Sequence, residues 1–236
     1  MKTLLTADWT NLLTATFETD KSFLEKYLPP GTELDDWNGK YFISLVAFMF
    51  EKPALLGIPS PFYRSFEEIN LRFYVRRKEK NEWRKGVVFI KEIAPYYIVG
   101  RAAKWLYKEN FVSLVMNHEF TNDNRIRNTN YSCRVNNKWN RLSMESASVN
   151  IEPEAETVEN FIRDHYWGYT KTTRNKTMEF RIEHRPWNIF PATKFEMNLD
   201  TGAIYGDELK EYLSAEPFSA FLMDGSYTKI SWPVLL

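Results

Sequence analysis

Three polar residues at alternate positions form a unit that could do chemistry. Glu68, Asn70 and Arg72 are separated by Ile69 and Leu71, and alternate residues of a β-strand point to the same side. A guanidinium presents a two-pronged donor for a carboxylate, and a carboxyl group beside it can exchange protons. The three side chains would bind an anion or position a proton transfer if this face lines a cavity. Antiparallel sheets commonly leave one face solvated, so composition alone favours a water-facing surface.

Lys108 is a candidate amine nucleophile. It follows the apolar run Trp105–Tyr107 and lies close to Phe111, and an apolar setting that desolvates an amine makes it nucleophilic near neutral pH. Glu109, directly after it, would instead stabilise the charged ammonium. Because most lysines extend from the surface, the residues alone favour a surface lysine.

Metal and cofactor signatures are absent from the sequence. His118, His165 and His184 are far apart, and Cys133 is the single cysteine, so no metal-ligand spacing is present. The sequence also contains no glycine-rich phosphate loop and no Gly-x-Ser-x-Gly elbow. We therefore expect no metal and no cofactor.

The composition limits the classes of partner. The 236 residues are 44% hydrophobic and 16% aromatic, and 31 basic residues balance 31 acidic ones. A chain without net charge lacks the field that attracts nucleic acid or an anionic membrane. Met1 to Phe17 do not have the pattern of a signal peptide, and one cysteine fits a reducing compartment. We expect a cytoplasmic protein that binds neither nucleic acid nor membrane, and nothing in the composition specifies an oligomeric state.

Short apolar runs between turn residues predict a protein rich in β-strands. The most legible strand alternates apolar and polar residues from Phe66 to Arg77. The expected strands in the first hundred residues are Leu12–Phe17, Tyr41–Phe50, Phe66–Arg77, Gly86–Ile90 and Tyr96–Val99.

Helices and a closing hairpin are predicted elsewhere. A short helix is expected from Ser22, a plausible N-cap, to Tyr27, and a second over Val158–Tyr166 after the cap Thr157. Asp224-Gly225 is a preferred dipeptide of tight hairpin turns, so we expect the chain to end on a hairpin.

Eight short phrases follow one another along nearly the whole chain. They are Leu28-Pro29-Pro30-Gly31, Asp36–Tyr41, Phe66–Val75, Gly86–Phe89, Arg101-Ala102, Phe161–Tyr169, His184–Trp187 and Asp224–Ser226. This ordered set resembles the YqjF-like family, which is similar to acetoacetate decarboxylase, and the resemblance implies an α+β, mostly β fold. The implied fold is a strongly bent antiparallel sheet or cone-like β-barrel around a pocket, with a few helices packed outside, in a single domain over residues 1–236.

The resemblance also implies a place for a Schiff-base lysine. In acetoacetate decarboxylases a pocket lysine downstream of a Val-Gly-Arg segment forms an imine with a β-keto acid. Here the segment is Val99-Gly100-Arg101, and the same interval leads to Lys108. The decarboxylases have a second lysine directly after the first, where this chain has Glu109.

Further site residues follow from the same resemblance. Glu68 stands where the superfamily places its pocket glutamate, so Lys108 and Glu68 are the candidate catalytic residues. The substrate-binding arginine of the decarboxylases corresponds roughly to Thr10. Arg72 or Arg101 would have to hold an anion instead, with Asn70 beside them.

Three functional hypotheses follow. The first is a pocket that binds a small carbonyl or carboxylate metabolite without turnover. The second is a lyase-type enzyme that uses Lys108 for Schiff-base chemistry. The third places the function on a partner-binding surface that the sequence does not mark. A cavity with Glu68, Asn70 and Arg72 pointing inward and Lys108 pointing outward would favour the binding protein.

Overall fold

β-Strands dominate the secondary structure. The computed structural model of the protein describes residues 1–108, 110–123, 125–172 and 174–236. The strands are β1 (Thr3–Thr19), β2 (Glu33–Leu34), β3 (Tyr41–Leu55), β4 (Ile58–Pro59), β5 (Ser65–Glu79), β6 (Glu82–Ala94), β7 (Phe111–Ser113), β8 (Met116–Asn122), β9 (Ile126–Val135), β10 (Lys138–Ala147), β11 (Trp167–Lys171), β12 (Thr177–Glu183), β13 (Ile189–Asn198), β14 (Ser219–Ser231) and β15 (Val234–Leu235). The helices are α1 (Lys21–Glu25), α2 (Tyr97–Leu106), α3 (Val158–Arg163), α4 (Thr201–Tyr205) and α5 (Asp207–Leu213).

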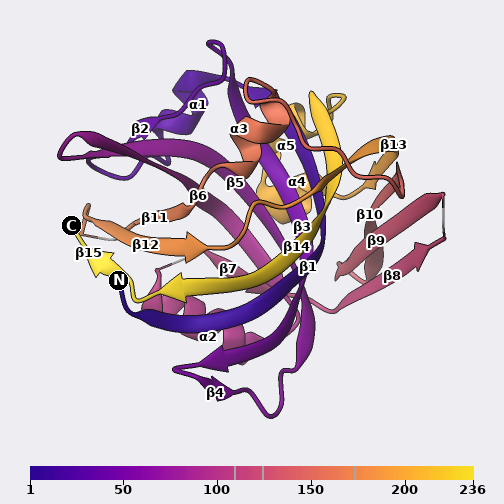
Figure 1. The fold of residues 1–236 in the computed structure, drawn as a ribbon, viewed down its shortest axis with the longest axis horizontal. Coiled ribbons are helices and arrows are strands. Elements are labelled where there is room, and N and C mark those ends of the chain that lie inside the picture. The colour runs from indigo at the N-terminus through magenta and orange to yellow at the C-terminus, as the bar shows by residue number, and fades with distance from the viewer. Residues whose placement is uncertain (109, 124, 173) are drawn as a thin grey trace.

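Seven of the strands form a closed ring. Their order is β1, β3, β5, β6, β11, β12 and β14, and β14 pairs again with β1. The ring closes through a short pairing between β12 and β14. The long strands curve strongly around the interior of this ring (Figure 1). A mostly β fold with a strongly bent sheet and a few helices is therefore confirmed. The pairings of β6 with β7 and with β11 are parallel, which makes the sheet mixed.

A second part of the sheet extends away from the ring. It continues from β14 through β13, β10 and β9 to the edge strand β8. Figure 1 shows it as a wing at the right of the molecule. The cavity described below has no lining residue from these four strands.

The alternation along the ring strands buries apolar side chains on both faces. On β5, Ile69, Leu71 and Phe73 belong to a cluster that includes residues of α1, α4 and α5. Phe66 and Tyr74 point to the opposite face, into a cluster with residues from six of the seven ring strands. The interior of the ring is therefore a second apolar core. Burial on both faces explains why the run from Tyr41 to Phe50 is almost uninterrupted in its hydrophobicity.

The expected strand at Tyr96–Val99 is wrong, because this segment begins helix α2. The N–H of Gly100 donates to Tyr96 O at 3.1 Å, which starts the helical turn. Gly100 also packs closely on Phe111, since a Cβ there would lie 2.6 Å from the ring. Tertiary packing thus overrides the strand propensity of the β-branched residues. None of the helices in the described residues is long and apolar enough to cross a membrane.

The expected closing hairpin is also wrong, because Asp224-Gly225 lies inside the continuous strand β14. Gly225 does have positive φ, +77°, but the strand continues through the dipeptide without reversing. Thr10 pairs with Gly225 and Leu12 with Met223, so the register with β1 is the same on both sides of Asp224. The carboxylate of Asp224 accepts hydrogen bonds from Arg185 and Asn188, and these contacts hold this part of β14 to the segment before β13.

One of the two expected helix caps is confirmed. The hydroxyl of Thr157 accepts a hydrogen bond from the Asn160 N–H at 3.3 Å, at the start of α3. The helix ends at Arg163, earlier than the expected Tyr166. Ser22 is not a cap, because α1 begins at Lys21 after Asp20.

Candidate functional site

A cavity of about 290 Å³ lies inside the ring of strands. Its walls come from β1, β3, β5, β6, β7, β12 and β14, together with the end of α2, Tyr107 directly after it, and the segment after β4. The described lining residues are Leu5, Trp9, Phe50, Pro53, Leu55, Ser60, Tyr63, Phe66, Glu68, Asn70, Arg72, Phe89, Glu92, Leu106, Tyr107, Phe111, Phe180, Ile182 and Ile230.

The polar face of β5 looks into this cavity. Glu68, Asn70 and Arg72 all line it, and the side-chain amide of Asn70 donates to Glu68 Oε1 at 3.3 Å. Glu68 is 8% exposed and Asn70 is 2% exposed. The structure thus brings these three residues together as the sequence grouped them. The water-facing alternative that composition favoured is wrong, because the ring turns this face inward.

Two polar atoms in this group have no hydrogen-bond partner within the described part of the chain. They are Asn70 Oδ1, an acceptor, and Arg72 Nε, a donor. Both are buried atoms of cavity-lining residues. A buried polar atom without a partner costs free energy, so a small shift of either side chain toward a ligand that donates to Asn70 or accepts from Arg72 would recover that cost.

The electrostatics leave Glu68 close to its titration point at neutral pH. Burial raises the pKa of Glu68 to about 7, against the opposing effects of the hydrogen bond from Asn70 and the charge of Arg72. A carboxyl group with this pKa can give or take a proton near neutral pH. The polar face of β5 therefore combines hydrogen-bonding groups with a carboxyl group that can exchange a proton near neutral pH.

Lys108 and Arg101 lie apart from this group. Lys108 is exposed, and its ammonium donates to Trp105 O at 2.9 Å. Arg101 is exposed on α2, and its guanidinium donates to the Tyr97 hydroxyl at 3.5 Å. Neither residue is among the described residues that line the cavity. Glu109, expected to oppose a lysine nucleophile, lies outside the described residues.

Sequence reasoning missed Glu92, and it did not identify which aromatic residues line the cavity. Glu92 is 5% exposed, lines the cavity and pairs across the sheet with Asn70. A β-bulge between the pairs Leu71–Lys91 and Arg72–Phe89 sets this register, and no local pattern of residue types marks a bulge. The alternation of apolar residues along the strands was the one signal in the sequence for the cavity walls. It cannot distinguish a strand face that packs in a solid core from one that lines a cavity.

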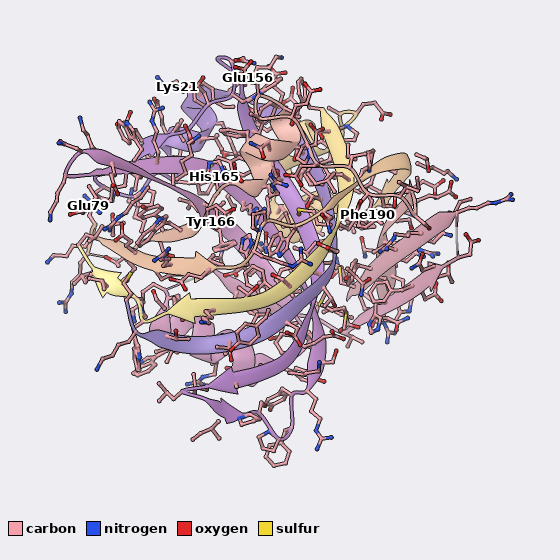
Figure 2. The ribbon with its side chains drawn as sticks, viewed as in Figure 1. Lys21, Glu79, Glu156, His165, Tyr166 and Phe190 are labelled. Carbon is pink, nitrogen blue, oxygen red and sulfur yellow. The ribbon has the colours of Figure 1, made fainter. Side chains whose placement is uncertain are left out.

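A second buried polar cluster lies outside the cavity, where the chain runs from α3 into β11. His165, labelled with Tyr166 in Figure 2, places Nε2 3.2 Å from Asp35 Oδ2 and Nδ1 2.7 Å from Phe161 O. Burial lowers the pKa of His165, although its hydrogen bond to Asp35 acts in the opposite direction. Lys85 Nζ also lies 3.6 Å from Asp35 Oδ2. These contacts join the loop before β3 to α3, a structural role.

No described residues are arranged as a metal site. Across the described ranges, no three His, Cys, Asp or Glu side chains group in a way that could hold a metal ion.

Several solved structures share the fold. Acetoacetate decarboxylase from Legionella pneumophila superposes with a TM-score of 0.68 at 9% identity, covering 100% of this chain and 88% of that one. An acetoacetate-decarboxylase-like enzyme from Sphingomonas wittichii RW1 gives 0.66 at 13% identity, covering 100% and 94%. The enduracididine biosynthesis enzyme MppR, in complex with pyruvate, gives 0.65 at 9% identity, covering 100% and 91%. At these identities the likeness shows the fold alone.

Sequence comparison identifies the family. The uncharacterized protein YqjF of Bacillus subtilis is 28% identical over 197 residues, which are 82% of this chain and 77% of that protein. Residues 6–226 match DUF2071, described as "Uncharacterized conserved protein (COG2071)". The expected resemblance to YqjF-like proteins is confirmed, and the chain belongs to the DUF2071 family.

Proposed function

We propose that the protein binds a small compound with a carbonyl or carboxyl group inside the ring of strands. Glu68, Asn70 and Arg72 make the polar contacts. The observation that supports this most is that Asn70 Oδ1 and Arg72 Nε, two buried atoms of residues that line one cavity, have no hydrogen-bond partner in the described part of the chain. A protonated carboxyl group is a small head group that can donate to the first atom and accept from the second.

Arg72 should carry much of the affinity. Titration calorimetry with acetoacetate, pyruvate and hexanoate should show saturable binding of at least one of them to the wild-type protein. Arg72→Met should weaken that binding about ten- to a hundredfold, because it removes a hydrogen bond from a charged group in a buried site. Lys108→Met is the matched control, since it removes a cation from an exposed position, and it should bind like wild type. No binding of any probe at millimolar concentration, or equal binding by Arg72→Met, would overturn the proposal.

The placement of Lys108 gives a separate prediction about Schiff-base chemistry. Its ammonium is exposed and donates to Trp105 O, so no apolar enclosure makes it a nucleophile. Incubation with acetoacetate or pyruvate and borohydride, followed by peptide mass mapping, should leave Lys108 unmodified. A reduced adduct on Lys108 would instead support the lyase-type alternative.

A further inference from the structure

The cavity is polar on one side and apolar elsewhere. Of its nineteen described lining residues, fourteen have apolar or aromatic side chains. The polar ones are Glu68, Asn70 and Arg72 from β5, Glu92 from the adjacent β6, and Ser60 after β4. The walls contributed by β1, β3, β12, β14 and the end of α2 are apolar.

The size of the cavity exceeds what a short keto acid would fill. A dry cavity of about 150 Å³ is enough to hold benzene, and this one measures about 290 Å³. A three- or four-carbon acid held at β5 would leave most of the apolar wall uncovered. Burial of apolar surface is the main source of favourable free energy for a ligand in such a site.

The apolar wall continues to the molecular surface. Leu55 lines the cavity and is 50% exposed. Ile58 at the start of β4 is 72% exposed, and Phe62 in the segment after β4 is 84% exposed. An apolar ligand could therefore pass from the surface to the cavity along apolar side chains.

We infer that the ligand is amphipathic, with one carbonyl or carboxyl head at Glu68, Asn70 and Arg72 and a medium-length aliphatic or single-ring body. The body lies against Trp9, Phe50 and the side chains of β12 and β14. This inference rests on the proposed binding function and names the ligand class for the same cavity.

A chain-length series tests the inference on the unaltered protein. Calorimetric titration with propanoate, butanoate, hexanoate and octanoate keeps the head constant and changes the body. Each added methylene should tighten binding about fourfold while the cavity has room. The gain should stop once the chain outgrows the cavity.

Two neighbouring variants locate the body of the ligand. Leu55→Gln places a polar side chain on the cavity wall. It should therefore reduce the gain in affinity for octanoate and leave the affinity for propanoate almost unchanged. Leu56→Gln is the matched control, because Leu56 is similarly exposed and is not among the described lining residues. It should behave like wild type for every acid.

The outcomes separate the two proposals. Rising affinity along the series, reduced by Leu55→Gln and by Arg72→Met, is the expected result. A flat or falling series, with short acids still bound through Arg72, would overturn the amphipathic ligand and leave the binding function standing. Absence of binding by all four acids, acetoacetate and pyruvate would overturn the binding function and the inference with it.

Discussion

Replacing Glu68 with glutamine should remove a large pH dependence of stability. Burial raises the pKa of Glu68 from 4.5 to about 7 in the folded protein. Below pH 4.5 the group is protonated in both states, and between 4.5 and 7 the unfolded chain ionises first. The wild-type free energy of unfolding should therefore fall by about 3 kcal/mol as the pH rises through this window. Denaturant titrations at a series of pH values measure it.

The glutamine variant isolates this group from the other titrations. Glu68→Gln keeps an acceptor for the Asn70 amide, which donates to Oε1 in the wild type, but does not ionise. Its free energy of unfolding, relative to wild type, should rise by about 3 kcal/mol across the same window. Glu82→Gln, at the exposed first residue of β6, is the control and should show no such rise. A constant difference between Glu68→Gln and wild type would contradict a buried, raised-pKa carboxyl.

Alanine at Gly225 should destabilise the protein by more than about 3 kcal/mol. Gly225 has φ of +77°, and a Cβ added there would lie 1.9 Å from the backbone oxygen of Trp9. Because that atom belongs to the paired strand β1, no rotation of a side chain relieves the clash. Thermal or denaturant unfolding of Gly225→Ala measures the loss.

Gly31 provides a control with the same backbone conformation. Its φ is also +77°, but a Cβ there meets nothing within 4 Å. Gly31→Ala should therefore lose only about 1 kcal/mol, the cost of the left-handed conformation itself. Equal losses for the two variants would show that β14 does not approach β1 at Gly225 as described.

The strands that could be predicted from the sequence are those with regular patterns. The alternation from Phe66 to Arg77 and the apolar run from Tyr41 to Phe50 correspond to β5 and β3. The two wrong elements, Tyr96–Val99 and the hairpin at Asp224-Gly225, both depended on local preference. The packing of Gly100 on Phe111 and the close approach of β14 to β1 determine the structure of these two segments instead. A local sequence pattern does not reveal these contacts, because they join residues that are far apart in the chain.

The candidate site could likewise be predicted from the sequence only in part. Alternate spacing along one strand was enough to group Glu68, Asn70 and Arg72, because the geometry of a strand fixes their common side. Composition could not say whether this side faced water, since closure of the ring depends on the pairing of β12 with β14. The prediction of Lys108 counted a fixed number of residues beyond Arg101. That stretch includes the end of α2, after which Lys108 has a φ of +63° and an exposed side chain.

The most direct test is a crystal structure of the protein with the tightest-binding acid among the probes. The account predicts the carboxyl head inside the ring, within hydrogen-bond distance of Asn70 and Arg72, with its body along the apolar walls. An acid bound outside this cavity, or a covalent adduct on Lys108, would contradict it.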